Sequence, residues 1–286
     1  MAFFSGKLAY ITGGSSGIGL ETARLLVSEG CSLVLFARNQ AGLDKAQKAL
    51  EGRTIEKNQR IDTVSMDVAD NDDVQRKTKA AVTEYGIPDI LINSAGIGTA
   101  DYFENISYEA FDRVMKINVY GTRNTIAALL PYMRKCGRGH IVNLSSEAGL
   151  IGMFGYSLYS TSKYALVGLS ECLRSELKRM NIDVTVVCPP EVDTPFVAEE
   201  APTLPPEARA VKSMAGLLKP EYVARTIVKA LKKKKFLVVP GLMARYLYFN
   251  HRISNGRLTH FFSDLIVRFT AQKKRPKGHG GEGARG

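Results

Sequence analysis

Short apolar runs alternate with amphipathic stretches along the first two thirds of the chain, and this alternation limits the possible folds most strongly. Residues 7–11 form the first apolar run, which ends at a glycine-rich turn over residues 12–19. Apolar residues then recur at helical spacing up to Gly30. The pattern predicts a strand, a glycine turn and a helix in direct succession.

The same alternation continues to about residue 188. Further strands are expected at residues 31–37, 62–66, 90–92, 139–144 and 183–188. Helices are expected at residues 40–57, 70–85, 107–135 and 157–180. Because strands separated by helices need crossover connections, we expect an α/β fold, a Rossmann-like, doubly wound and mostly parallel sheet with helices on both faces.

The positive charge is concentrated at the end of the chain. The net charge is +11, but residues 1–208 carry −4 and residues 209–286 carry +15. No recognition motif for nucleic acid accompanies this charge, so a nucleic-acid partner is not expected. The four cysteines form no close pair, which predicts neither a metal site nor a disulfide framework. With no leader and no apolar run of about twenty residues, a cytoplasmic location is expected.

The glycine turn has the composition of a phosphate-binding loop. Gly13, Gly17 and Gly19 are spaced G-x-x-x-G-x-G, and they lie between an expected strand and an expected helix. Such a turn lets the backbone and the positive end of the helix approach a pyrophosphate. The next expected strand ends in Ala37-Arg38 without a carboxylate, which favours NADP(H) over NAD(H). The alternative is that Arg38 is a solvated surface residue.

A second set of residues carries acid–base chemistry. Tyr159 and Lys163 stand four residues apart on an expected helix, so they share one face. They occur together with the glycine turn, with the segment 93–96 (Asn-Ser-Ala-Gly), with Asn118, and with the segment 145–146 (Ser-Ser). In this combination and order, over about residues 5–230, the chain resembles the short-chain dehydrogenase/reductase family.

The resemblance implies four catalytic residues. Tyr159 would be the general acid for reduction of a ketone, and Lys163 would lower the pKa of the phenol and hold the nicotinamide ribose. Ser146 would polarise the substrate carbonyl, with Ser145 as the neighbouring alternative. Asn118 would anchor a water that passes protons to Lys163.

The motifs also define the expected cofactor site. Asp67 and Val68 resemble the adenine-contacting pair, and the segment 189–194 resembles the loop over the nicotinamide, although Pro190 stands where the family often has glycine. The full set of expected contacts to NADP(H) is Gly13, Ser15, Ser16, Gly17, Ile18, Gly19, Arg38, Asp67, Val68, Asn93, Ala95, Gly96, Tyr159, Lys163, Pro189, Val192 and Thr194. The family resemblance also implies a homodimer or homotetramer.

Several local stretches are similar to the subfamily that reduces 3-ketodihydrosphingosine with NADPH. They include residues 152–155, 189–190, 193–195 and 219–221, and the last three fall in or beside an expected substrate lid at 189–220. The resemblance implies NADPH-dependent reduction of a long-chain lipid ketone, with 3-ketodihydrosphingosine reduced to dihydrosphingosine. The alternatives are another hydrophobic carbonyl, such as a steroid, retinoid or fatty ketone, and a scaffold without catalysis.

The C-terminal quarter has a different character. After a reductase domain at residues 1–235, we expect a basic amphipathic helical extension at 236–271 and a disordered tail at 272–286. The extension carries an apolar stripe at helical spacing, composed of Leu258, Phe261, Phe262, Leu265, Ile266 and Phe269. With the arginines and lysines around it, residues 236–275 suit an anionic membrane surface on the cytoplasmic side. Packing of the stripe on the main domain or on a second subunit is an equal alternative.

Overall fold

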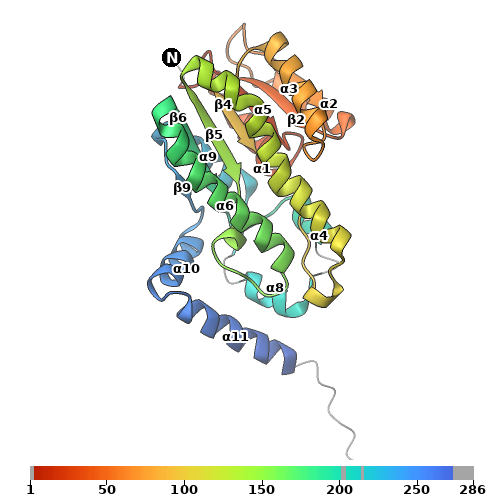
Figure 1. The fold of residues 1–286 in the computed structure, drawn as a ribbon, viewed down its shortest axis with the longest axis vertical. Coiled ribbons are helices and arrows are strands. Elements are labelled where there is room, and N and C mark those ends of the chain that lie inside the picture. The colour runs from red at the N-terminus through yellow and green to blue at the C-terminus, as the bar shows by residue number, and fades with distance from the viewer. Residues whose placement is uncertain (1–2, 201–203, 214–215, 273–286) are drawn as a thin grey trace, which may run out of the picture.

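A seven-stranded parallel sheet forms the centre of the computed structural model, which describes residues 3–200, 204–213 and 216–272 (Figure 1). The strand order is β3-β2-β1-β4-β5-β6-β9, and all neighbouring strands are parallel. In chain order the strands are β1 (Leu8–Thr12), β2 (Ser32–Ala37), β3 (Ile61–Ser65), β4 (Ile90–Asn93), β5 (Gly139–Leu144), β6 (Ile182–Val187) and β9 (Leu237–Val238). The expected doubly wound fold is confirmed.

Helices cover both faces of this sheet. One face carries α1 (Gly17–Val27), α2 (Gln40–Glu51) and α9 (Pro220–Lys233). The opposite face carries α3 (Asn71–Tyr85), α5 (Gly121–Cys136) and α6 (Ser157–Leu177), and α5 and α6 lie in front of the strands in Figure 1. The central strands are therefore buried on both sides, which explains the largely apolar sequences of β1, β2 and β4, whereas the edge strand β3 is only partly buried.

The first strand shows how the two cores divide the side chains. Ala9 and Ile11 pack with α1 on one face, whereas Tyr10 points to the other face and packs on Phe36, with ring centroids 5.3 Å apart. The Tyr10 hydroxyl donates to the carbonyl of Gly86 at 2.8 Å, so a large polar group is buried without an unsatisfied donor.

Helix boundaries follow local chemistry. α3 begins where the side chain of Asp70 accepts hydrogen bonds from the amides of Asp72 and Asp73, and it ends at Gly86, whose φ is 103°. α2 was expected to reach residue 57 but ends at Glu51, because Gly52 follows as its C-cap.

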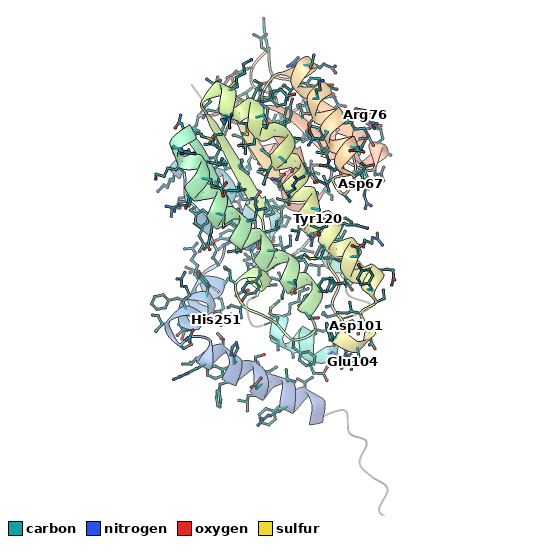
Figure 2. All side chains as sticks on the ribbon, viewed as in Figure 1. Asp67, Arg76, Asp101, Glu104, Tyr120 and His251 are labelled. Carbon is teal, nitrogen blue, oxygen red and sulfur yellow. The ribbon has the colours of Figure 1, made fainter. Side chains whose placement is uncertain are left out.

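The long helix expected at 107–135 is interrupted. It consists of α4 (Tyr108–Met115), a π-helical turn η2 (Lys116–Tyr120) and α5. Tyr120, labelled in Figure 2, marks the end of the π-helical turn. Such turns are rare and frequently occur at functional sites. This turn carries Asn118, one of the expected catalytic residues.

The segment expected to form a substrate lid, at 189–220, contains regular secondary structure. The described part of 189–220 contains β7 (Glu191–Val192), α7 (Pro195–Glu200), α8 (Pro206–Lys212) and β8 (Leu217–Leu218). β7 and β8 pair in parallel as a separate small sheet. Pro195 and Pro206 stand at helix starts, where the missing N–H costs nothing and the fixed φ suits the helix.

The C-terminal segment begins inside the sheet. β9 pairs with β6, so a strand lies just beyond residue 235, where the main domain was expected to end. Two helices follow, α10 (Leu242–Ile253) and α11 (Arg257–Gln272), and α11 packs against α8 at the lower end of Figure 1. Of the disordered tail expected at 272–286, Gln272 is instead the last residue of α11, and residues 273–286 lie outside the described residues. The remaining short elements are η1 (Phe103–Asn105), η3 (Glu147–Gly149) and η4 (Lys178–Met180).

Candidate active site

A cavity of about 220 Å³ opens at the carboxyl ends of the central strands. This is the edge at which doubly wound sheets bind their ligands. The walls come from the glycine turn, the ends of β4 and β5, the first turns of α6, and the segment from Pro189 to α8. Of the expected site residues, the cavity is lined by Gly13, Ser16, Gly17, Ile18, Gly96, Ser146, Tyr159, Lys163, Pro189, Val192 and Thr194.

The glycine turn has a shape that side chains would prevent. Gly13 and Gly17 have φ values of 67° and 54°, in the left-handed region that favours glycine. A Cβ on Gly13 would lie 2.8 Å from the amide nitrogen of Ala95, and one on Gly19 would overlap the carbonyl oxygen of Gly13. The glycine turn therefore lies directly against the loop after β4, and the first helix lies directly against the turn.

The start of α1 offers free hydrogen-bond donors. Ser16 is its N-cap but makes no side-chain capping bond, and the first turn contains no acidic residue. The first-turn amides are thus available to an anion, and the helix dipole favours one there. This glycine-lined cradle fits the pyrophosphate of a dinucleotide.

Tyr159 and Lys163 meet in the cavity as their spacing predicts. The ammonium of Lys163 lies 5.4 Å from the centre of the Tyr159 ring and donates a 2.9 Å hydrogen bond to the carbonyl of Leu144. Lys163 is only 5% exposed, and its burial lowers its pKa from 10.5 to about 8. A buried cation beside a phenol favours the phenolate, so it makes Tyr159 a better proton donor.

The two neighbouring serines play different roles. The hydroxyl of Ser145 is buried and donates to the carbonyl of Lys163 at 2.8 Å, so it ties β5 to α6. The hydroxyl of Ser146 accepts from the amide of Ala148 at 3.2 Å and donates to the carbonyl of Pro189 only at 3.4 Å. A ligand oxygen could replace that long bond. The geometry favours Ser146 over Ser145 as the group that contacts a ligand.

Asn118 is held rigidly behind the cavity. Its amide bonds the backbone of Ile97 twice, as donor and as acceptor, both at 2.9 Å, and it also donates to the hydroxyl of Ser162 at 3.0 Å. A Cβ on Gly96 would lie 3.2 Å from Asn118 Oδ1 and 3.6 Å from Lys163 Nζ, so both side chains flank this glycine. The water expected between Asn118 and Lys163 stays a prediction.

Other expected cofactor residues lie outside the cavity walls. The side chain of Asn93 is buried in the core, where it donates to Asn143 at 2.9 Å and accepts from Thr125 at 2.7 Å. Asp67, labelled in Figure 2, caps its own turn by accepting from the amide of Ala69 at 3.0 Å. Arg38 is exposed at the end of β2. The other expected cofactor residues outside the walls are Ser15, Gly19, Val68 and Ala95, and the expected catalytic residue Asn118 also lies outside them.

Some cavity residues were not among the expected site residues. Phe196 of α7 packs on the ring of Tyr159, with centroids 5.7 Å apart, and Met153 and Tyr156 line the cavity beside it. Lys212 of α8 pairs with Glu191 at 3.0 Å across the wall, and Glu147 lies next to Ser146. Phe196 and Lys212 come from segments distant in sequence from Tyr159, whereas Glu147 directly follows Ser146 and Tyr156 lies three residues before Tyr159.

The arrangement brings a phenol, a buried ammonium and a hydroxyl to one apolar-walled cavity. A carbonyl oxygen bound between Ser146 and Tyr159 would find one hydrogen-bond donor and one acid. Among the described residues, no cluster of side chains could hold a metal ion. The described helices also include none long and apolar enough to cross a bilayer.

Comparisons with known proteins agree with this geometry. The family described as short chain dehydrogenase matches residues 7–205. The 3-ketodihydrosphingosine reductase of Bos taurus is 40% identical over 225 residues, which cover 78% of this chain and 68% of that protein. The crystal structure of levodione reductase has a TM-score of 0.76 at 27% identity, covering 83% of this chain and 97% of that chain. A short-chain dehydrogenase/reductase from Burkholderia phymatum, solved in complex with NAD, has a TM-score of 0.75 at 26% identity, covering 93% and 96%.

Proposed function

The chain belongs to the short-chain dehydrogenase family and is an oxidoreductase of carbonyl or CH–OH groups, and from this premise we propose that it is an NADPH-dependent reductase of a long-chain lipid ketone. The leading substrate is 3-ketodihydrosphingosine, which would be reduced to dihydrosphingosine. The observation that carries the proposal is the placement of Tyr159, Lys163 and Ser146 around one cavity.

The glycine turn would hold the cofactor. Gly13 and Gly17 have backbone angles that residues with side chains rarely adopt. The start of α1 has no side-chain cap, so its free amides can bind the pyrophosphate. When bound, the nicotinamide supplies a hydride to the carbonyl carbon. Arg38 at the end of β2 supports NADP(H) over NAD(H), since a guanidinium can bind the 2′-phosphate with two hydrogen bonds.

Tyr159 would deliver the proton. A ketone that accepts a hydride at carbon needs a proton at oxygen, and the Tyr159 hydroxyl is the acid that faces the cavity beside Ser146. The Lys163 ammonium stabilises the phenolate that this transfer leaves behind. Ser146 donates a hydrogen bond to the same carbonyl oxygen and orients it.

Substitution of Tyr159 by Phe tests this chemistry. The variant lacks only the hydroxyl, so we expect a fall in kcat of at least 100-fold, within the range that a lost general acid produces, while NADPH binding changes little. Tyr164, exposed on the same helix, gives the matched control Tyr164→Phe. Substantial turnover by Tyr159→Phe would contradict the assignment.

Substrate class is tested by comparing ketones. 3-Ketodihydrosphingosine, a steroid ketone, a retinoid aldehyde and a fatty ketone would be assayed side by side with NADPH. The highest kcat/KM is expected for 3-ketodihydrosphingosine. A preference for one of the other carbonyls would move the function to that class, and no NADPH consumption with any of them would favour the scaffold alternative.

The two C-terminal helices would hold the enzyme at an anionic membrane. Phe249 and Phe261 are 62% and 64% exposed, although large apolar side chains are normally buried. The large apolar residues exposed on these helices are Leu242, Met243, Tyr246, Phe249, Ile253, Leu258, Phe261, Phe262, Leu265 and Phe269. Exposed arginines at 245, 252, 257 and 268 accompany them. Cations around an apolar face suit anionic lipid.

The membrane proposal needs a test that keeps the sheet intact. Deleting everything after residue 235 would remove β9, so we choose the double variant Phe261→Asp with Phe269→Asp in the full chain. Loss of co-sedimentation with phosphatidylserine vesicles is expected, with Phe103→Asp as the matched control for an exposed Phe on η1. Unchanged binding would refute the membrane site. A change in oligomeric state instead, measured by sedimentation, would assign the face to a second subunit.

A further inference from the structure

Glu147 is a buried acid at the boundary of the active-site cavity. It begins η3 directly after Ser146, and the residue is only 4% exposed. Its amide donates to the carbonyl of Pro189 at 2.8 Å, which fixes the backbone at this point. Glu147 lines the active-site cavity together with Ser146 and Tyr159.

One carboxyl oxygen of Glu147, Oε1, is buried and has no hydrogen-bond partner in the described part of the chain. The two cations of the cavity are directed elsewhere, since Lys212 pairs with Glu191 at 3.0 Å and Lys163 donates to Leu144. Burial raises the pKa of the Glu147 carboxyl to about 7. An uncompensated buried carboxylate is costly, and such groups occur where a ligand supplies the missing charge.

A second cavity continues from this point. It encloses about 110 Å³ between η3, α8, α10 and α11, and it shares Glu147 and Met153 with the active-site cavity. Its other walls are mainly apolar and include Ile151, Val211, Leu247, Leu258 and Phe262. A ligand with its reacting carbon near Tyr159 thus has an acid beside it and an apolar space beyond.

We propose that Glu147 binds the ammonium group of an amino-ketone substrate. This inference rests on the proposed function, because 3-ketodihydrosphingosine carries its amine on the carbon next to the ketone. Ser146 and Glu147 line the same cavity as Tyr159, so groups on neighbouring carbons of one ligand can reach both. Ser146 holds the carbonyl oxygen, Glu147 holds the ammonium, and the alkyl chain passes Met153 into the second cavity.

The ion pair would form where both charges are shielded from water. Because Glu147 is buried, little water hydrates its carboxylate. An ammonium group that enters the cavity supplies a charge-assisted hydrogen bond in place of that missing water. A neutral ligand of the same length leaves the carboxyl unpaired and gains nothing from it. Glu147 therefore selects amino ketones from neutral ketones, and it acts in binding rather than in proton transfer to the carbonyl.

Two substrates and two variants test the subsite. 3-Ketodihydrosphingosine and the amine-free 1-hydroxyoctadecan-3-one have the same chain and the same ketone position. With Glu147→Gln we expect KM for the amino ketone to rise at least tenfold, with KM for the amine-free ketone within twofold of the wild type. Glu147→Asp keeps the charge and is expected to retain most of the preference. Glu176→Gln, an exposed acid on α6, is the matched control.

The outcomes distinguish failure of the Glu147 subsite from failure of the proposed substrate. An equal loss on both ketones in Glu147→Gln, or no loss on either, would overturn the subsite while leaving the proposed function intact. A wild-type enzyme that reduces the amine-free ketone but not the amino ketone would refute the proposed substrate, and the subsite with it. Because Gln removes an uncompensated charge, the variant should melt no lower than the wild type, and a clearly lower melting temperature would also count against the unpaired carboxylate.

Discussion

Lys163 is expected to destabilise the protein at neutral pH, and removing its charge should reveal by how much. Its ammonium is buried and has one protein hydrogen bond, to the carbonyl of Leu144 at 2.9 Å. Burial lowers its pKa from 10.5 to about 8, so the folded state disfavours the charged form. We therefore expect Lys163→Met to lose activity and yet to resist unfolding at pH 7.

The magnitude follows from linkage. The lowering of the Lys163 pKa from 10.5 to about 8 reduces the free energy of unfolding by about 3 kcal/mol at pH 7 and by about 1 kcal/mol at pH 9.5. The destabilisation of the folded state by Lys163 is greatest below pH 8 and disappears as the pH rises towards 10.5. Between these values the unfolded chain binds a proton that the folded chain has lost, so the free energy of unfolding rises with pH. Lys163→Met also loses the hydrogen bond to Leu144, which lowers the free energy of unfolding of the variant by about 1–3 kcal/mol at every pH.

Urea unfolding of the cofactor-free protein at pH 7 and pH 9.5 measures this effect. The free energy of unfolding of Lys163→Met relative to the wild type should fall by about 2 kcal/mol between the two pH values. Lys178→Met, an exposed lysine just after α6, is the control and should show no such change. A difference between Lys163→Met and the wild type that does not vary with pH would refute the buried, destabilising ammonium.

Two further perturbations address the cofactor site. Gly19→Ala places a methyl group against the carbonyl of Gly13, so we expect the free energy of unfolding to fall by about 1–3 kcal/mol and NADPH to bind more weakly in a titration. The control Gly168→Ala has open space around it and should be neutral or stabilising. Equal behaviour of the two variants would contradict the close approach of Gly19 to Gly13. Arg38→Asp should raise KM for NADPH at least tenfold and favour NADH, with exposed Arg53→Asp as control, and an unchanged NADPH to NADH ratio would argue against the 2′-phosphate contact.

Local sequence patterns were sufficient where an element is buried on both faces. The apolar runs that became β1, β2 and β5 were recognisable because the apolar residues of such a strand pack on one or the other of two cores. The spacing of Tyr159 and Lys163 placed both on one face of α6, and the structure brings both to the cavity. These features depend on residues close together in sequence.

Elements whose signals are short or ambiguous were not recognised. β9 has two residues, Leu237 and Val238, and it is a strand because β6 offers an open edge. The helices α7 and α8 begin at prolines, and a proline has the same appearance in a loop and at the first position of a helix. Tertiary contacts, such as that of Phe196 with Tyr159, decide between the two.

The succession from β1 to β6 with the helices between them, the glycine cradle and the pair of Tyr159 and Lys163 could be predicted, because each of these is encoded by neighbouring residues. Which polar groups are buried, and what surrounds them, depends on tertiary packing. Glu147 follows two serines in a turn and would be taken for a surface acid, yet packing leaves it 4% exposed between two cavities. Burial is a property of the assembled chain, since the walls around Glu147 come from η3, α8, α10 and α11.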